Sequence, residues 1–144
     1  MFVRELKFRA AVLLLLTVLA YSAVSCGVIG GSKDDLAGTK WKIETMGGAP
    51  PPVTLIITAE FNDGRVSGSS GCNSYGATYT IDNSKLEIGD IAVTEMACLE
   101  EGVMQFEQSF LELLGMVRSY SLSESRLDLM DEGGNAVLSF VAAQ

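Results

Sequence analysis

The fold is decided by the stretch Val53-Thr-Leu-Ile-Ile-Thr-Ala-Glu-Phe-Asn-Asp-Gly-Arg-Val-Ser-Gly-Ser69. From Val53 to Phe61 every second residue is apolar, which is the period of a strand with one buried face. Asn62-Asp63-Gly64 follows as a hairpin turn signal, because these residues tolerate the positive φ angles of a tight turn. Residues 65–69 are then expected to return as the partner strand. This stretch therefore predicts an antiparallel hairpin.

Two more hairpins are predicted on its C-terminal side. Residues 79–88 and 120–129 share one pattern, in which Tyr and Ile or Leu precede a polar turn and two aliphatic residues follow it. Further strands are expected at 41–45 and 136–142. Short strands joined by tight turns indicate an antiparallel meander. About seven or eight such strands usually curl into a barrel, because closure removes exposed edges.

One segment follows the helical period instead. From Glu100, apolar residues recur at helical spacing at Val103, Phe106, Phe110, Leu113, Leu114 and Val117. Glu100 and Glu101 suit the N-terminal dipole, and Gly115 is a candidate C-cap. Met104, Leu111 and Met116 widen the stripe, which favours core packing, with a lipid-binding groove as the alternative. The predicted class is α+β, mostly β: an antiparallel meander curled into a small barrel-like sheet with one packed helix.

The N-terminus has the composition of a secretory signal. Three bases lie within the first nine residues, an uncharged apolar run follows from Ala10 to Ala20, and small residues lead to Cys26. This order predicts a signal peptide over residues 1–25, since the apolar run is shorter than the ~20 residues of a spanning helix. Residues 26–35 are expected to be a short tether, and residues 36–144 the folded domain.

A modification site is predicted where the signal ends. Ala23-Val-Ser-Cys26 resembles the lipobox of bacterial lipoproteins, in which the Cys receives a diacylglyceryl thioether and becomes the new N-terminus. Ala23 stands where Leu is commonest, and Ala23 and Ser25 also suit an ordinary signal peptidase. We expect lipidation at Cys26, with ordinary cleavage as the alternative. The chain is then an exported lipoprotein anchored to a membrane of the bacterial cell envelope, the outer membrane in a Gram-negative cell.

The mature chain is strongly acidic. Without residues 1–25 it has 7 basic and 17 acidic residues, a net charge near −10. Phosphate binding needs clustered Lys and Arg, so nucleic acid is not an expected partner. The same charge repels anionic lipid surfaces and favours a soluble domain, which we expect to be monomeric.

The residue types argue against catalysis. The chain has no His, so the usual base for a Ser or Cys nucleophile is missing. Gly68-Ser-Ser-Gly71 is one residue short of a nucleophile elbow. Two Cys cannot close a zinc site, and the acids lack the spacing of a calcium loop. We therefore expect no enzymatic activity, no metal and no cofactor.

Five blocks of the mature chain together resemble the META domain, the family of the bacterial heat-shock lipoprotein HslJ. The blocks are Leu36–Trp41, Gly64–Tyr75, Tyr79, Thr94–Cys98 and Glu107–Leu111. The resemblance implies a small antiparallel barrel-like fold with one helix, and an envelope protein linked to stress or antibiotic tolerance without an established enzymatic activity. It departs at Ala77, where the family usually has Gly.

The resemblance also implies site residues. Cys72 and Cys98 each lie in a motif block, and a structural disulfide between them is favoured. A redox-active pair is the alternative, although Cys-x-x-Cys spacing is missing, and two reduced buried thiols are a third reading. The other motif residues mark a candidate binding loop and its surroundings: Trp41, Gly68, Gly71, Asn73, Tyr75, Tyr79 and Met96.

The function predicted from the sequence is a non-enzymatic envelope binding module. Its partner is an envelope protein or a lipid-like ligand, and it is attached to the membrane through its N-terminal lipid. One alternative is a thiol-redox activity through Cys72 and Cys98. The other is an inhibitor of an envelope hydrolase that inserts the loop rich in Gly and Ser, since loops on rigid scaffolds commonly carry function.

Overall fold

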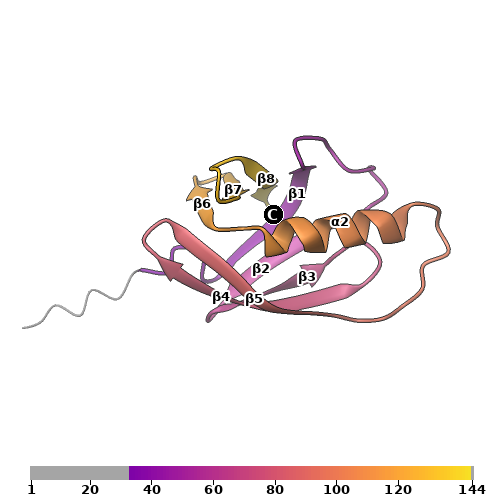
Figure 1. The fold of residues 1–144 in the computed structure, drawn as a ribbon, viewed down its shortest axis with the longest axis horizontal. Coiled ribbons are helices and arrows are strands. Elements are labelled where there is room, and N and C mark those ends of the chain that lie inside the picture. Colours follow the sequence, from indigo (N-terminus) through magenta and orange to yellow (C-terminus); the bar gives the residue numbers. More distant parts are fainter. Residues whose placement is uncertain (1–32, 144) are drawn as a thin grey trace, which may run out of the picture. The chain divides into compact units, whose positions relative to one another are not determined.

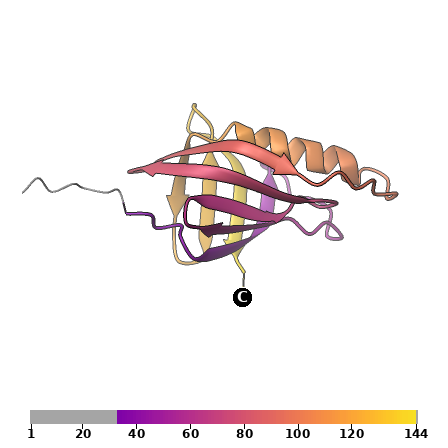
Figure 2. The ribbon, with the colours of Figure 1, turned by 90° about the horizontal axis from the view of Figure 1, so that it is seen from below.

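The computed structural model describes residues 33–143 as eight antiparallel strands in a ring-like sheet with one helix against it (Figures 1 and 2). The predicted signal peptide, Cys26 and most of the predicted tether lie outside these residues. Within them, no helix is long and apolar enough to cross a membrane. The predicted fold class is confirmed.

The strands pair in sequence order, and β8 returns to β1 to complete the ring. The elements are β1 (Thr39–Met46), β2 (Thr58–Asn62), β3 (Arg65–Ser69), β4 (Ser74–Asp82), β5 (Lys85–Val93), α2 (Val103–Gly115), β6 (Ser119–Leu122), β7 (Arg126–Met130) and β8 (Ala136–Ala142). Each connection, including the long one through α2 between β5 and β6, joins strands that are neighbours in the ring, so the sheet has no crossover connection.

The hairpin predicted within residues 53–69 is formed by β2 and β3. Phe61 pairs with Val66, and the turn places Asp63 and Gly64 at φ angles of 45° and 74°. The expected strand start at Val53 is wrong, because β2 begins only at Thr58. The three prolines before Val53 lack the N–H that a ladder needs, and a turn closes at Leu55, whose N–H donates to the carbonyl of Pro52 at 2.9 Å. Val53 is fully exposed as a result.

The core fills the inside of the ring with alternate side chains of the strands. Phe61, Phe110 and Phe140 are fully buried. Phe61 packs edge-to-face on Tyr79 with ring centroids 5.3 Å apart, and Phe110 of α2 packs in the same way on Tyr75 at 5.1 Å. Phe110 therefore attaches the helix to the sheet through an aromatic pair.

The helix differs in detail from the prediction. It begins at Val103, so Glu100 and Glu101 precede it and its first turn contains no acid, and its C-cap is Met116 rather than Gly115. The buried face consists of Val103, Glu107, Phe110 and Leu114. Phe106, expected in the apolar stripe, is 36% exposed, and a glutamate lies on the buried face instead.

The ring is weakest between β5 and β6. These strands pair only at Lys85 and Ser119 within the described residues, with flanking bonds from Leu86 N–H to the Arg118 carbonyl (3.0 Å) and from Tyr120 N–H to the Ser84 carbonyl (3.1 Å). Beyond that point, no strand of the described part of the chain pairs with this side of β5. Helix α2 lies along this free edge of β5 (Figure 2).

Candidate functional site

The loop between β3 and β4, predicted as a binding loop, is folded into the protein. Asn73 is 3% exposed, and its side-chain oxygen accepts from Thr94 Oγ1 at 2.9 Å and from Met96 N–H at 2.7 Å. Its amide nitrogen donates to the Met96 carbonyl at 3.2 Å and to Glu107 Oε1 at 2.8 Å. The whole hydrogen-bonding capacity of this side chain is therefore used to join the loop to the segment after β5 and to α2.

Glu107 completes this buried network from the helix. Its Oε2 accepts from Ser70 Oγ at 2.6 Å and from Asn73 N–H at 2.8 Å. Burial raises the pKa of Glu107, but the hydrogen bonds from Ser70 and Asn73 outweigh it and hold the pKa below its ordinary value. Glu107 is therefore a carboxylate that fixes the helix to the loop, and not a poised general acid or base.

A disulfide reinforces the same junction. Cys72 and Cys98 are bonded, with Cα atoms 6.0 Å apart, and they close a loop with a sequence separation of 26. This confirms the favoured pairing. The bond lies beside Asn73 in the chain, so covalent and polar links hold the same loop against the segment that leads into α2.

The remaining motif residues have structural positions, except for one. A Cβ on Gly68 would lie 2.1 Å from the Thr58 carbonyl oxygen, and Gly71 has a φ of 114° and lies against Leu55. Position 68 has no room for a Cβ, and position 71 has a backbone angle that glycine adopts readily and other residues rarely adopt.

The three aromatic motif residues are core side chains with one polar contact each. Trp41 donates to Thr39 Oγ1 at 2.7 Å, Tyr75 to the Thr58 carbonyl at 3.0 Å, and Tyr79 to Asp34 Oδ2 at 2.5 Å. The contact with Tyr79 places Asp34, expected in the tether, in the folded domain. Met96 alone is exposed, with 57% of its surface accessible.

An open apolar groove lies between β5 and α2. It has a volume of about 580 Å³ and is lined by Ile91, Val93, Met104, Gln105, Glu107, Gln108, Leu111 and Glu112. Val93 and Met104 are 39% and 42% exposed, so their apolar side chains are open to solvent in the groove. Leu111 was expected to widen a packed stripe, but it contributes to this groove. The sequence signal for the site was the excess of apolar residues on the helix, which a single buried face cannot hold.

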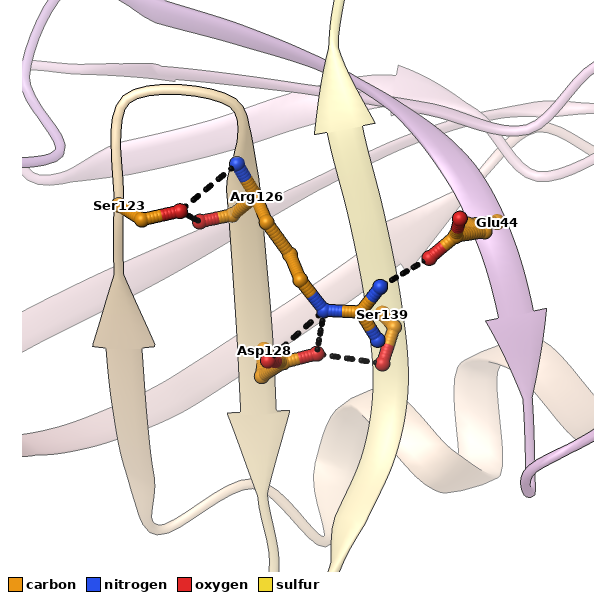
Figure 3. Close-up of polar contacts among 5 residues, drawn as sticks. All are labelled: Glu44, Ser123, Arg126, Asp128 and Ser139. Atoms are coloured by element: carbon orange, nitrogen blue, oxygen red, sulfur yellow. Dashed lines mark hydrogen bonds and ion pairs between the residues drawn. The ribbon is translucent and has the colours of Figure 1, made fainter.

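A second polar cluster lies on the outside of β1, β7 and β8 (Figure 3). Arg126 Nε is 3.0 Å from both oxygens of Asp128, and Arg126 Nη1 pairs with Glu44. Ser139 Oγ donates to Asp128 at 2.6 Å. Burial raises the pKa of Asp128, but hydrogen bonds from Arg126 and Ser139 hold the pKa below its ordinary value. A carboxylate paired in this way is a poor base for Ser139, so the cluster has the chemistry of a surface ion-pair network.

Comparison with known proteins places the chain among relatives of the same architecture. The family model of the META domain matches residues 34–144. A search of the curated proteins found no match. The fold resembles the NMR structure of a protein from Burkholderia xenovorans, with a TM-score of 0.63 and 24% identity over 76% of this chain and 84% of that one. It also resembles the crystal structure of a DUF4847 family protein from Bacteroides vulgatus, with a TM-score of 0.57 and 18% identity over 77% and 96% of the two chains.

Proposed function

This chain belongs to the META domain family, and we propose that it is an exported, non-enzymatic binding module whose ligand site is the groove between β5 and α2. The observation that carries the proposal is a contrast between the polar motif residues and the apolar residues of the groove. Asn73 and Glu107 hydrogen-bond to each other within the protein, whereas the apolar side chains of Val93 and Met104 are open to solvent. An exposed apolar groove of this kind is where proteins bind ligands or partners.

Export is supported by the disulfide as well as by the signal segment. Bonds such as that between Cys72 and Cys98 persist in oxidising compartments and are rare in the cytosol. We propose further that Cys26 is lipidated, which anchors the domain to an envelope membrane through the residues before Asp34. Intact mass of protein from the native membrane fraction tests this: a chain that starts at Cys26 with added acyl mass is expected, and an unacylated chain would refute the anchor.

The partner is proposed to be another envelope component, and the role in stress or antibiotic tolerance follows the family resemblance. Deletion of the chain should then lower survival under such stress, and expression of a groove variant should fail to restore it. Met104→Lys is suited to this test, because it places a charge in the groove from an exposed position. Full restoration by Met104→Lys would show that the groove is not the functional site.

Met104 in α2 and Met116, the C-cap residue of α2, are a matched pair of positions for locating the site directly. Met104 lies in the groove, and Met116 lies outside it with a similar exposure of 49%. A photo-crosslinking amino acid placed at position 104 in cells should give discrete adducts, and the same residue at position 116 should not. Equal labelling from the two positions would contradict the proposed site.

A further inference from the structure

The groove lies beside a strand edge that the fold leaves open. On one side, β5 pairs with β4 from Lys85 to Val93; on the other, it pairs with β6 only at Lys85 within the described part of the chain. Thr94 N–H donates toward β4, to the Ser74 carbonyl at 3.0 Å. β5 has a bulge between Gly89 and Ala92, and beyond it Val93 pairs with Tyr75. Because backbone groups alternate along a strand, the N–H and C=O groups of Val93, which precedes Thr94, point away from β4.

Such an edge is a template for one more strand. An unpaired row of N–H and C=O groups accepts an extended polypeptide by main-chain hydrogen bonds, and neighbouring pockets then choose among its side chains. Here the pocket walls are Ile91 and Val93 from β5 and Met104 and Leu111 from α2. An added strand would turn alternate side chains toward these four residues, and burial would favour apolar ones.

The charges around the groove indicate what the other side chains should be. The acidic rim of the groove consists of Glu112, which lines it, and of Glu95, which is exposed two residues after Val93. The groove lining contains no Lys or Arg. Basic side chains on the incoming strand would therefore be attracted electrostatically, and an anionic lipid headgroup would be repelled.

We propose, on the basis of the function proposed above, that the groove binds an extended polypeptide that adds as a strand to the free edge of β5. Its apolar side chains fill the space between β5 and α2, and its Lys or Arg residues face the acidic rim. A lipid tail could use the apolar walls, but it offers no partners for the backbone groups of Val93. These backbone groups and the acidic rim together select a polypeptide.

A displayed library of random octapeptides, selected on the mature protein, tests the recognition pattern. Met104→Lys serves for counter-selection and Met116→Lys as the matched surface control. Enriched peptides should alternate apolar residues with Lys or Arg, should bind the Met116→Lys protein normally, and should lose at least tenfold in affinity for Met104→Lys. Failure to enrich any peptide on the wild type over Met104→Lys would overturn the inference.

The backbone contact is tested with the best synthetic peptide from that selection. Binding should protect the amide of Val93 from hydrogen exchange and leave the amides of β7 unchanged. Methylation of one peptide nitrogen that faces β5 should weaken binding about fivefold, the effect of one lost hydrogen bond of typical strength. Equal affinity of the methylated peptide would refute strand addition. Binding of palmitate that Met104→Lys abolishes, with no peptide binding, would refute the polypeptide but leave the groove as the functional site.

Discussion

Replacement of Asn73 by Ala should be among the most destabilising changes of a polar residue in this domain. The substitution removes four hydrogen bonds, which join the side chain to Thr94, to both backbone groups of Met96 and to Glu107. The backbone of residue 73 and its N–H bond to Glu107 Oε2 remain. The effect should therefore report on the side chain alone.

The size of the effect follows from what is left behind. Glu107 Oε1 loses its donor in a site where the residue is only 5% exposed, and a lost hydrogen bond to a charged group costs about 1.5–3 kcal/mol. The bonds to Met96 and Thr94 are neutral and nearer to water, and they add roughly 1 kcal/mol. We expect a loss of about 3 kcal/mol, a large share of the ~5–15 kcal/mol of a typical domain.

Urea denaturation of the oxidised protein, followed by circular dichroism, measures this difference. The midpoint should fall with an unchanged slope, and Tm should fall by roughly 10–15 °C for a domain of this size. Asn62→Ala is the control, because Asn62 is exposed and lies at the end of β2, and it should stay within about 0.5 kcal/mol of the wild type. A loss below about 1 kcal/mol for Asn73→Ala would refute the view that this network holds loop and helix together.

Three further predictions address the same architecture. Joint replacement of Cys72 and Cys98 by Ala should lower the unfolding free energy by about 3 kcal/mol, because a loop with a separation of 26 residues is no longer closed in the unfolded chain; a change below about 1 kcal/mol in urea would contradict this. Gly68→Ala should lower the unfolding free energy by about 2 kcal/mol or more through its contact with the Thr58 carbonyl, whereas Gly76→Ala, whose Cβ would meet only Arg65 Nη2 at 3.5 Å, should be tolerated. Similar thermal midpoints for the two variants would show that the contact at Gly68 does not exclude a Cβ. The pKa of Glu107 is lower in the folded than in the unfolded protein, so its contribution to the unfolding free energy is present above the unfolded pKa of about 4.3 and is lost as pH falls through the folded pKa. Glu107→Gln should therefore reduce the fall of the unfolding free energy at acidic pH, and an unchanged pH dependence would refute the role of Glu107 as a stabilising carboxylate.

Local features of the chain were predictable because they depend on neighbours in sequence. The turn at Asp63-Gly64 has the positive φ angles that its residues tolerate. The last strand, expected at 136–142, is β8 with those bounds. Each of these elements is specified by residues within a few positions of one another, so one sequence window contained the whole signal.

The burial of Glu107 was not predictable from its neighbours in sequence. A glutamate in an amphipathic helix normally faces solvent, and the apolar period placed Phe106 on the buried side instead. The donors that make burial of Glu107 favourable, on Ser70 and Asn73, lie 37 and 34 positions away in the chain. No helical window contains them, so the rotation of the helix on the sheet could not be read from its own residues.

The sequence by itself predicted the order of the strands and the presence of one helix, since each rests on a short-range pattern, and it favoured the disulfide between Cys72 and Cys98 that the structure contains. The tertiary structure alone decided that, among residues 33–143, β5 and β6 pair only at Lys85 and Ser119, and that α2 lies beside the open edge. Lateral pairing depends on how far strands distant in sequence extend past one another in space. For this reason the groove of Val93 and Met104 arises from the closure of the sheet rather than from a motif.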